Sequence, residues 1–332
     1  MIIISSYGLA VFLLFISMIC WGSWANTQKL ASREWGFQLY YWDYTIGLVL
    51  LSLFFGLSLG SMGEVGRSFL PDLAQASTPA LIAAFIGGVI FNIANLLVVA
   101  AIDLAGMAIA FPIAIGLALV LGVFINYIGE AKGDPVLLFA GVALVVIAII
   151  LNALAYKRKS SQQKESSTKG ILISILGGII MSFFYRFVAD SLVDDFANPE
   201  AGKLTPYSAV FVFAIGVFLS NFIWNSFFMY RPVSGKAVTY TDYFRNGNTR
   251  LHLIGILGGI IWCVGMFLSI LSSDIAGPAI SYGLSQGATM VAAAWGVFIW
   301  KEFKDAPKGT NQLIYAMFAF FIIGLTLIIY AR

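Results

Sequence analysis

The stretch GGVIFNIANLLVVAAIDLAG at residues 87–106 decides the fold, because it is one apolar run long enough to cross a membrane and it has a counterpart later in the chain. The counterpart is GGIIWCVGMFLSILSSDIAG at 258–277, where the paired glycines, the aspartate and the final Ala-Gly recur 171 positions later. Asp134 and Asp305 keep the same offset. So many matches at one spacing indicate a duplication within the chain.

The composition excludes a soluble protein. The chain has 332 residues, of which 60% are hydrophobic and 11% are charged, and its mean hydropathy is +0.91. Soluble globular proteins have about 25% charged residues, so this chain has too little charge to cover a water-exposed surface. Disorder is excluded by the same apolar content. A polytopic membrane protein remains, because a lipid-facing surface needs no charge.

Ten apolar runs of about 20 residues follow one another along the chain. They cover roughly residues 7–27, 40–60, 79–102, 106–127, 135–156, 170–189, 206–230, 251–272, 275–298 and 312–330. Backbone groups in lipid find no water to bond, so each run is expected to be a helix and the fold class to be all-α.

One solvated linker, KRKSSQQKESSTK at 157–169, divides the chain. It separates a predicted five-helix repeat at 1–156 from a second one at 170–332. Because five is an odd number, the second repeat must cross the membrane the opposite way up. The expected architecture is therefore ten transmembrane helices in two inverted repeats, which is typical of transporters.

Basic residues predict the orientation of the chain. Of the 19 lysines and arginines, Arg186 lies within a predicted span, and four lie in loops on the side away from the linker. The remaining 14 (19 − 1 − 4) lie on the side of the linker. Those four are Arg67, Lys132, Lys203 and Arg332. Because basic loops stay in the cytoplasm, we expect a cytoplasmic linker and both termini outside the plasma or inner membrane. The start MIIISSYG has no basic region, so the first run is expected to be a retained span.

Polar side chains at bilayer depth predict where a solute binds, since they are costly unless they face the bundle interior or a wet cavity. Amides and tyrosines supply donors and acceptors, and an indole supplies a flat apolar wall, which together suit a small neutral polar solute. The predicted solute-binding residues are Trp24, Asn92, Asn95, Asn221, Asn225, Trp262, Tyr282 and Gln286. Two alternatives stay open: the amides could bond helix to helix, and Trp24 could belong to an interfacial aromatic belt.

Ionisable residues near the ends of the spans are candidates for gating. Arg186 and Asp190 are four residues apart, so they could form a helical ion pair, or Arg186 could extend to the interface. In a gate, Asp274 would join Arg186 at the outer mouth. Its counterpart Asp103 would lie at the inner mouth, near Lys29 and Arg33.

Asp43, in WDYTIG at the start of the second run, is the best candidate for coupling to protons, or alternatively to sodium. Its neighbours Trp42 and Tyr44 could equally form an aromatic belt. No cofactor or metal is expected: Cys20 and Cys263 are isolated and His252 is the one histidine. The chain also lacks a phosphate-binding loop, HExxH and a nucleophile elbow, which disfavours nucleotide-driven transport and an enzyme. Pro112 and Pro278 lie in the first turns of their spans, where proline is tolerated.

The residues resemble a known family. In the first half these are WDYTIG at 42–47, FLPDLAQAS at 69–77, the stretch at 87–106 and GVFINYIGE at 122–130. In the second half they are LTPYSAVFVF at 204–213, NSFFMYRPVSG at 225–235 and WGVFIWKEF at 295–303. Nearly the whole chain resembles the ureide permeases, and it is similar to the glucose/ribose/rhamnose porters of the drug/metabolite transporter superfamily. The resemblance implies a central cavity within spans one to four and six to nine, with spans five and ten at the periphery.

We therefore expect a secondary active transporter that imports a sugar or a ureide or nucleobase by alternating access, with proton symport. The alternatives are an exporter of the same superfamily, a channel or sensor, and, least favoured, an intramembrane enzyme. The expected partners are a small-molecule substrate, protons or sodium, and the lipid bilayer, with no nucleic acid. The chain is expected to act as a monomer or homodimer.

Overall fold

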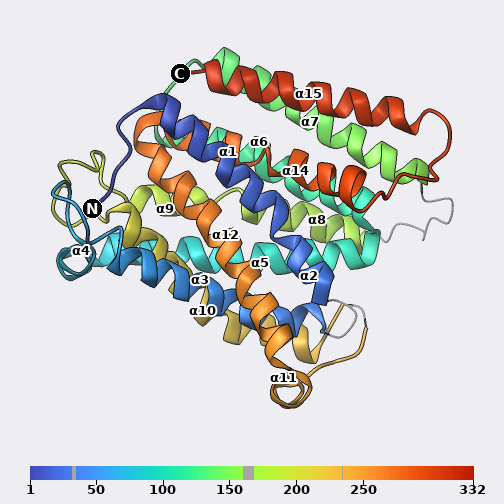
Figure 1. Cartoon of the computed structure of the whole chain (residues 1–332), viewed down its shortest axis with the longest axis horizontal. Helices are drawn as coiled ribbons and strands as arrows, with labels where there is room; N and C mark the ends of the chain where they lie inside the picture. Colours follow the sequence, from blue (N-terminus) through green and yellow to red (C-terminus); the bar gives the residue numbers. More distant parts are fainter. Residues whose placement is uncertain (32–34, 160–167, 234) are drawn as a thin grey trace.

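The computed structural model describes residues 1–31, 35–159, 168–233 and 235–332, and in this part of the chain every named element is a helix. Most of the predicted linker falls outside the described residues, as do Arg33 and Lys164 of the basic residues counted above. The prediction of an all-α polytopic membrane protein is confirmed. Figure 1 shows the helices as one elongated bundle.

Helices of the first half are α1 (Tyr7–Ser23), α2 (Ala25–Ala31), α3 (Phe37–Leu57), α4 (Phe69–Gln75), α5 (Thr78–Ala105), α6 (Met107–Gly129) and α7 (Pro135–Lys159). Those of the second half are α8 (Thr168–Met181), α9 (Phe184–Ser191), α10 (Pro206–Tyr230), α11 (Tyr240–Asn246), α12 (Thr249–Ala276), α13 (Pro278–Ser285), α14 (Ala288–Ala294), the π-helical η1 (Trp295–Ile299) and α15 (Thr310–Tyr330).

Nine helical stretches of the described chain are long and apolar enough to cross a membrane. They correspond to nine of the ten predicted runs. The run predicted at 275–298 is instead divided into α13, α14 and η1, so the count of ten stays a prediction. The division follows from the backbone: Gly287 N–H bonds back to Leu284, three residues earlier, and Thr289 N–H bonds to Gln286 in the same way. This tightening occurs well after Pro278, so proline does not cause it.

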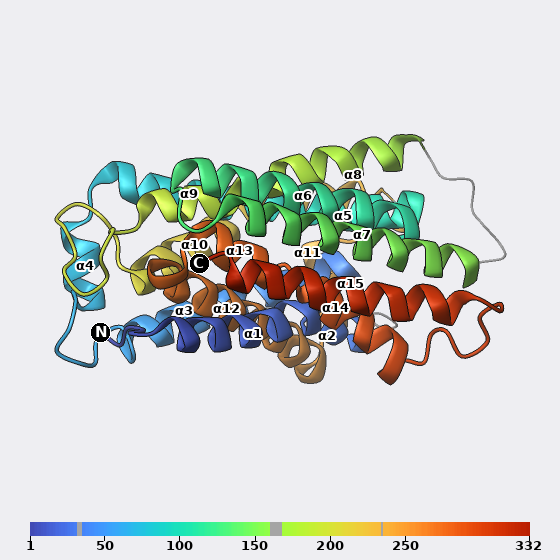
Figure 2. The same ribbon diagram turned by 90° about the horizontal axis from the view of Figure 1, so that it is seen from above.

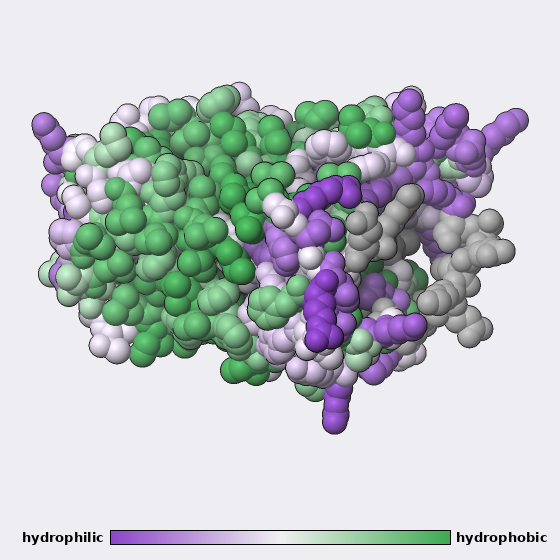
Figure 3. Space-filling model, turned by 60° about the horizontal axis from the view of Figure 1, so that its bottom comes forward, coloured by the Kyte–Doolittle hydropathy of each residue, from purple (hydrophilic) through white to green (hydrophobic). Residues whose placement is uncertain are grey.

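The two ends of the bundle differ. At the terminal end, as we name it, α1 begins and α15 ends, and the Tyr7 hydroxyl donates to the carbonyl of Ile329 at 2.5 Å. At the opposite end, the linker end, α7 ends and α8 begins. Helix α4 lies at the terminal end (Figures 1 and 2). Helix α11 directly precedes α12 and lies at the bottom of Figure 1, on the side of the bundle where α2 ends. Apolar side chains cover a broad band between the ends (Figure 3), as a lipid-facing surface requires.

Two helix crossings bring backbones into contact through glycine. A Cβ built on Gly88 of α5 would lie 2.1 Å from the carbonyl oxygen of Phe213 in α10. A Cβ built on Gly259 of α12 would lie 1.9 Å from the carbonyl oxygen of Tyr44 in α3. Each crossing has a second such glycine, since Gly216 meets the carbonyl of Phe85 and Gly47 meets that of Ile256. Small residues allow this close approach.

The paired crossings match the arrangement expected of a duplicated chain. The first contact joins the third and seventh predicted spans, and the second joins the eighth and second. Helix α1 likewise packs on α12 as α8 and α9 pack on α5. Helices α7 and α15 pack against each other at the edge of the bundle (Figure 1), where the resemblance puts spans five and ten. The inverted repeat itself stays a prediction that these contacts favour.

Candidate functional site

A cavity of about 370 Å³ lies at the terminal end. The last turn of α6, the helix α9 and the junction of α12 with α13 line it. Its charged lining residues are Glu130, Arg186, Asp190, Asp194, Lys203 and Asp274. The structure thus brings Arg186, Asp190 and Asp274 together, which are the residues predicted for a gate at this end.

Contacts within this terminal-end cavity hold the charges in place. Arg186 forms an ion pair with Asp190, one helical turn away. Its guanidinium lies over Gly129, where a Cβ would overlap it. Lys132 donates to the backbone carbonyl of Asp274. Burial raises the pKa of Glu130, so this carboxyl binds a proton more readily than an exposed glutamate.

A second cavity, of about 400 Å³, lies at the linker end. It is lined by the end of α1 and α2, the start of α6, the end of α7, and α14 with η1. Apart from Lys29 and Glu302, which pair with each other, its polar and aromatic walls are formed by Asn26, Gln28, Phe111, Asn152, Tyr156, Trp295 and Trp300. Such a lining suits a neutral solute.

An ion pair closes one side of this linker-end cavity. Lys29 Nζ lies 2.8 Å from Glu302 Oε1 and 4.1 Å from the centre of the Trp300 ring. The Tyr156 hydroxyl donates to Glu302 Oε2 at 2.7 Å. Although burial alone would raise it, the pKa of Glu302 is held below its usual value by these two partners. The carboxylate therefore stays ionised and keeps the pair closed at neutral pH.

A buried layer of hydroxyl groups separates the two cavities. Ser17 Oγ donates to Ser285 Oγ at 3.1 Å, and Ser285 Oγ donates to Ser269 Oγ at 3.0 Å. Ser269 Oγ in turn lies 3.1 Å from the hydroxyl of Tyr185. Tyr282 completes this hydroxyl layer: its ring centre is 5.3 Å from that of Tyr185, and it donates to the α6 carbonyl of Ala118. All five side chains are buried, and they come from α1, α9, α12 and α13.

The order of residues along α13 and α14 places the hydroxyl layer between the two cavities. Pro278 lines the terminal-end cavity and Thr289 lines the linker-end cavity. Tyr282 and Ser285 lie between them in the chain, and the predicted binding residue Gln286 follows at the break before α14. A solute passing from one cavity to the other along this helix would have to cross the hydroxyl layer.

An aromatic cluster adjoins the layer. Trp262 stacks on Trp21 with ring centres 5.5 Å apart, and lies 4.3 Å from Phe91. Phe91 in turn contacts Phe184, whose ring lies 6.1 Å from that of Tyr282. The predicted residues Trp262 and Tyr282 are thereby connected through aromatic rings of α5 and α9. Such rings provide flat apolar faces around a neutral solute.

The four predicted asparagines gather between α3, α5 and α10. Asn92 donates to Ser220 Oγ at 2.8 Å, and Asn225 donates to the carbonyl of Gln38 at 2.8 Å. Asn221 donates to Thr45 at 3.5 Å, and Asn95 donates to the Tyr41 hydroxyl at 3.2 Å. The alternative of helix-to-helix bonding is thus true of their amide nitrogens. Among the described residues, however, the side-chain oxygens of Asn92, Asn221 and Asn225 accept no hydrogen bond.

Those orphaned oxygens matter because an unsatisfied buried acceptor costs about 1–3 kcal/mol. All three lie on or against two successive turns of α10. A solute with N–H or O–H donors would satisfy them. Trp24 is partly buried, and its ring centre lies 5.0 Å from that of the buried Tyr44.

Asp43 lies apart from both cavities, since it is absent from the described lining of either. It is 1% exposed and accepts a hydrogen bond from Tyr243 at 2.5 Å. His252 Nδ1 lies 2.9 Å from one carboxylate oxygen and 3.0 Å from the other. The sequence did not reveal either partner. The only signal was that α3 and α12 both begin at the linker side of the predicted topology.

The prediction that Asp103 lies at the inner mouth, near Lys29 and Arg33, stays a prediction. Asp103 lies at the linker end of α5 and lines a small pocket with Gln38 and Phe228. Lys29, expected near it, forms an ion pair with Glu302. Arg33 lies outside the described residues.

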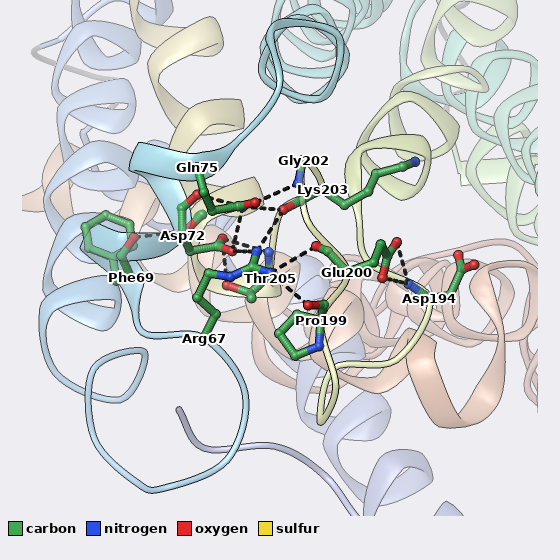
Figure 4. A network of polar contacts seen from close by, with 11 residues as sticks. Arg67, Phe69, Asp72, Gln75, Asp194, Pro199, Glu200, Gly202, Lys203 and Thr205 are labelled. Carbon is green, nitrogen blue, oxygen red and sulfur yellow. Dashed lines mark hydrogen bonds and ion pairs between the residues drawn. The ribbon is translucent and has the colours of Figure 1, made fainter.

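A polar network fastens the terminal end (Figure 4). Arg67 donates to the buried carboxylate of Asp72 at 2.9 Å and to the carbonyl of Pro199 at 2.8 Å. Asp72 also accepts from the backbone and the hydroxyl of Thr205, so α4 is joined to the loop before α10. The network reaches the terminal-end cavity through Lys203, whose carbonyl accepts from Gln75, and through Asp194, whose N–H donates to Glu200. Its role is to hold the loop.

The chain is similar to known proteins in its sequence and in its fold. The sequence model of the ureide permease family matches residues 40–169 and 153–331. Ureide permease 1 of Arabidopsis thaliana is 22% identical, over 99% of this chain and 98% of its own. The probable glucose uptake protein GlcU of Priestia megaterium is 24% identical, over 97% and 96%. A solved crystal structure, 16% identical, aligns over 97% of this chain and 96% of its own with a TM-score of 0.56, which shows the likeness of fold alone.

Proposed function

Since the chain belongs to the ureide permease family and is a transporter of small polar solutes, we propose that it is a secondary active importer of one neutral solute. The solute is a sugar or a ureide or nucleobase, and the transporter works by alternating access with proton symport. The relatives support both solute classes, because some are named ureide permeases and others probable glucose uptake proteins.

One observation carries the proposal: two cavities at opposite ends of the same helices are separated by a single buried layer of hydroxyl groups. Helices α6 and α13 to η1 reach from one cavity to the other. Opening one cavity toward the layer while the other stays closed is the geometry that alternating access needs. Arg186, Asp190 and Asp274 gate the terminal end, and Asp103 with the Lys29–Glu302 pair gates the linker end.

The neutrality of the solute follows from the polar groups at depth. The hydroxyl layer and the three orphaned amide oxygens carry no formal charge, and the adjoining walls are aromatic. A charged solute would be left without a counter-ion there, which is costly in a low-dielectric site. Asn92, Asn95, Asn221, Asn225, Trp24, Trp262, Tyr282 and Gln286 remain the residues we assign to solute binding.

The energy for import comes from an ion gradient, since the sequence carries no nucleotide-binding loop. Asp43 holds the exchanged proton in this proposal. The orientation proposed is both termini outside the cell membrane and the 157–169 linker in the cytoplasm. A cysteine placed at position 162 should then react with an impermeant reagent only from the cytoplasmic side.

Counterflow in vesicles tests the function. Purified protein is first screened against glucose, allantoin and uracil by thermal shift, because a ligand that binds the folded state raises its stability. The stabilising solute is then loaded into vesicles, and uptake of the labelled solute is measured. Saturable uptake that unlabelled solute inside accelerates supports a carrier. Uptake that stays linear with concentration would indicate a channel instead.

An exporter is the second candidate, and the aromatic lining of the linker-end cavity favours it. Phe111, Tyr156, Trp295 and Trp300 give that cavity walls that could accept larger apolar compounds. Accumulation in inside-out vesicles under an imposed proton gradient separates the two directions. Import requires that the solute leave such vesicles, whereas export fills them.

A further inference from the structure

The carboxylate of Asp43 is enclosed by two other titratable side chains. His252 Nδ1 lies 2.9 and 3.0 Å from its two oxygens, and the Tyr243 hydroxyl donates to it at 2.5 Å. The three residues come from α3, α12 and α11, so they join elements far apart in the sequence. Gly255 makes room for this cluster, because a Cβ there would lie 2.4 Å from Cβ of Asp43. In the described membrane-spanning helices, Asp43 is the only buried carboxylate.

We propose that Asp43, His252 and Tyr243 form a proton-binding site, which we call the proton site, and that its charge state holds or releases α11 at the linker end. The proposal deepens the proposed function, on which its coupling role rests. With neutral His252 donating from Nδ1, the site carries one net negative charge. One proton from water on Nε2 makes it an imidazolium–carboxylate pair with no net charge.

The second ring nitrogen is placed to exchange that proton. Nε2 makes no hydrogen bond among the described residues, and the side chain of His252 is 28% exposed. It faces Gly247, where a Cβ would lie 2.3 Å away. Asp43, by contrast, is 2% exposed by its side chain. Protons therefore reach the buried carboxylate through the imidazole, from the linker end.

Among the described residues, no permanent charge on the elements packed against the site substitutes for that proton. The groups that titrate beside Asp43 are Tyr40 and Tyr44 on its own helix, together with Tyr243 and His252. The charged side chains of the elements packed against it lie in solvent or are engaged elsewhere. They are Lys29 on α2, Arg231 after α10, Asp242 and Arg245 on α11, and Arg250 on α12. The protonation state of His252 therefore sets the net charge of the site.

The charge state acts on α11 through Tyr243. A buried net charge is costly, so the deprotonated site favours entry of water, whereas the neutral pair favours burial. Trp35 covers the cluster, with its ring centre 5.4 Å from His252 and 5.8 Å from Tyr243. Loss of the proton should draw water into the cluster between Tyr243 and the crossing of α3 and α12, and so free α11. Proton release and opening of the linker end are thereby one event.

Hydrogen exchange of the α11 backbone tests the site without any solute. In the wild-type full-length chain, exchange corrected for its intrinsic pH dependence should rise about tenfold as the pH passes from acid to alkaline. His252→Gln keeps a hydrogen-bond donor but cannot titrate, so its exchange should not change with pH. Tyr240→Phe is the matched control, because Tyr240 is on the same helix and bonds Ser226 instead.

The coupling role is measured in vesicles with glucose and allantoin as probes. His252→Gln should lose accumulation under an imposed proton gradient and keep counterflow at equal pH, and Tyr240→Phe should keep both. If His252→Gln shows the wild-type pH dependence of α11 exchange, the proton site is overturned. If α11 responds as expected but the wild type shows no counterflow, the proton site stands and the proposed function fails.

Discussion

Two helix crossings have the same backbone contact and different chemistry. Where α5 meets α10, Gly88 lies on a carbonyl, and one turn later Asn92 bonds Ser220, with no ionisable group. Where α12 meets α3, Gly259 lies on a carbonyl, and one turn before Gly47 the acid Asp43 bonds His252. Glycine fixes how close the helices come, whereas the polar residue one turn away differs between the two crossings, and with it the ligand that we propose for each. The first crossing suits a neutral solute and the second a proton.

The largest effect on stability should come from adding a side chain to the glycines at which the two pairs of helices meet. Gly88→Ala and Gly259→Ala each place a Cβ within about 2 Å of a backbone oxygen, which cannot move aside as a side chain can. Both should destabilise the protein by about 1–3 kcal/mol or more and lower its melting temperature in detergent. Gly116→Ala, with open space around it, is the control and should stabilise by about 0.5–1 kcal/mol. If one of the two variants kept the wild-type melting temperature, the two helix crossings would not be held by the same backbone contact.

The second largest effect is expected from a substitution of the acid at the α3–α12 crossing. Asp43→Asn keeps the shape of the side chain but cannot ionise, so proton-driven accumulation should be lost while exchange at equal concentrations continues. Proteoliposomes with an imposed inward proton gradient measure both. Asp305→Asn, an exposed acid, is the matched control. Wild-type accumulation by Asp43→Asn would remove Asp43 from the coupling site.

The corresponding change at the α5–α10 crossing should be more modest. Asn92→Leu removes one donor and one acceptor, and an unpaired polar group on the solute costs about 1–3 kcal/mol. The affinity for solute should fall about tenfold or more, with proton coupling unchanged. Binding is measured by titration, and the exposed Asn311→Leu serves as control. Unaltered affinity in a folded Asn92→Leu protein would mean that the residue only joins helices.

The smallest effect concerns the helix that covers the α3–α12 crossing. Asp242 and Thr239 form a capping box at the start of α11, and the hydrogen bonds from Thr239 lower the pKa of Asp242. Because the folded pKa is depressed, the stabilisation is present above the unfolded value and is lost as the pH falls through the folded one. At pH values low enough to protonate Asp242, below the range in which an ordinary aspartate titrates, α11 amides should therefore exchange slightly faster. Asp242→Asn should show that faster exchange at neutral pH, and an unaltered rate would contradict the cap.

The sequence predicted what depends on hydropathy and on residues close in the chain. Buried positions of Asn92 and Asn221 follow from their depth in apolar runs, and the Arg186–Asp190 pair follows from its spacing of four. The break at Gln286 could not be predicted, because an average over 20 residues does not register a hydrogen bond that shifts by one position. It divides a run that composition presents as continuous.

Contacts between residues that are distant in the chain could not be predicted from the sequence either. His252 is 209 residues from Asp43, and the pair exists only because Gly255 and Gly259 bring α12 against α3. Read alone, a single histidine excluded a metal site and suggested nothing more. Likewise, the pairing of Lys29 with Glu302 joins residues 273 positions apart.

The turns that end α5 and α12 have the same backbone conformation, although most side chains of the two helices differ. Gly106 has φ +80° and ψ 156°, and Gly277, at the matching position, has φ +83° and ψ 150°. That backbone region is open essentially to glycine alone. Almost any mutation at either position would strain the turn, so genetic drift cannot erase it, whereas the faces of the helices can diverge freely. In an ancient duplication, such turns would be the last features to lose their likeness, and they are where a search for remote relatives should begin.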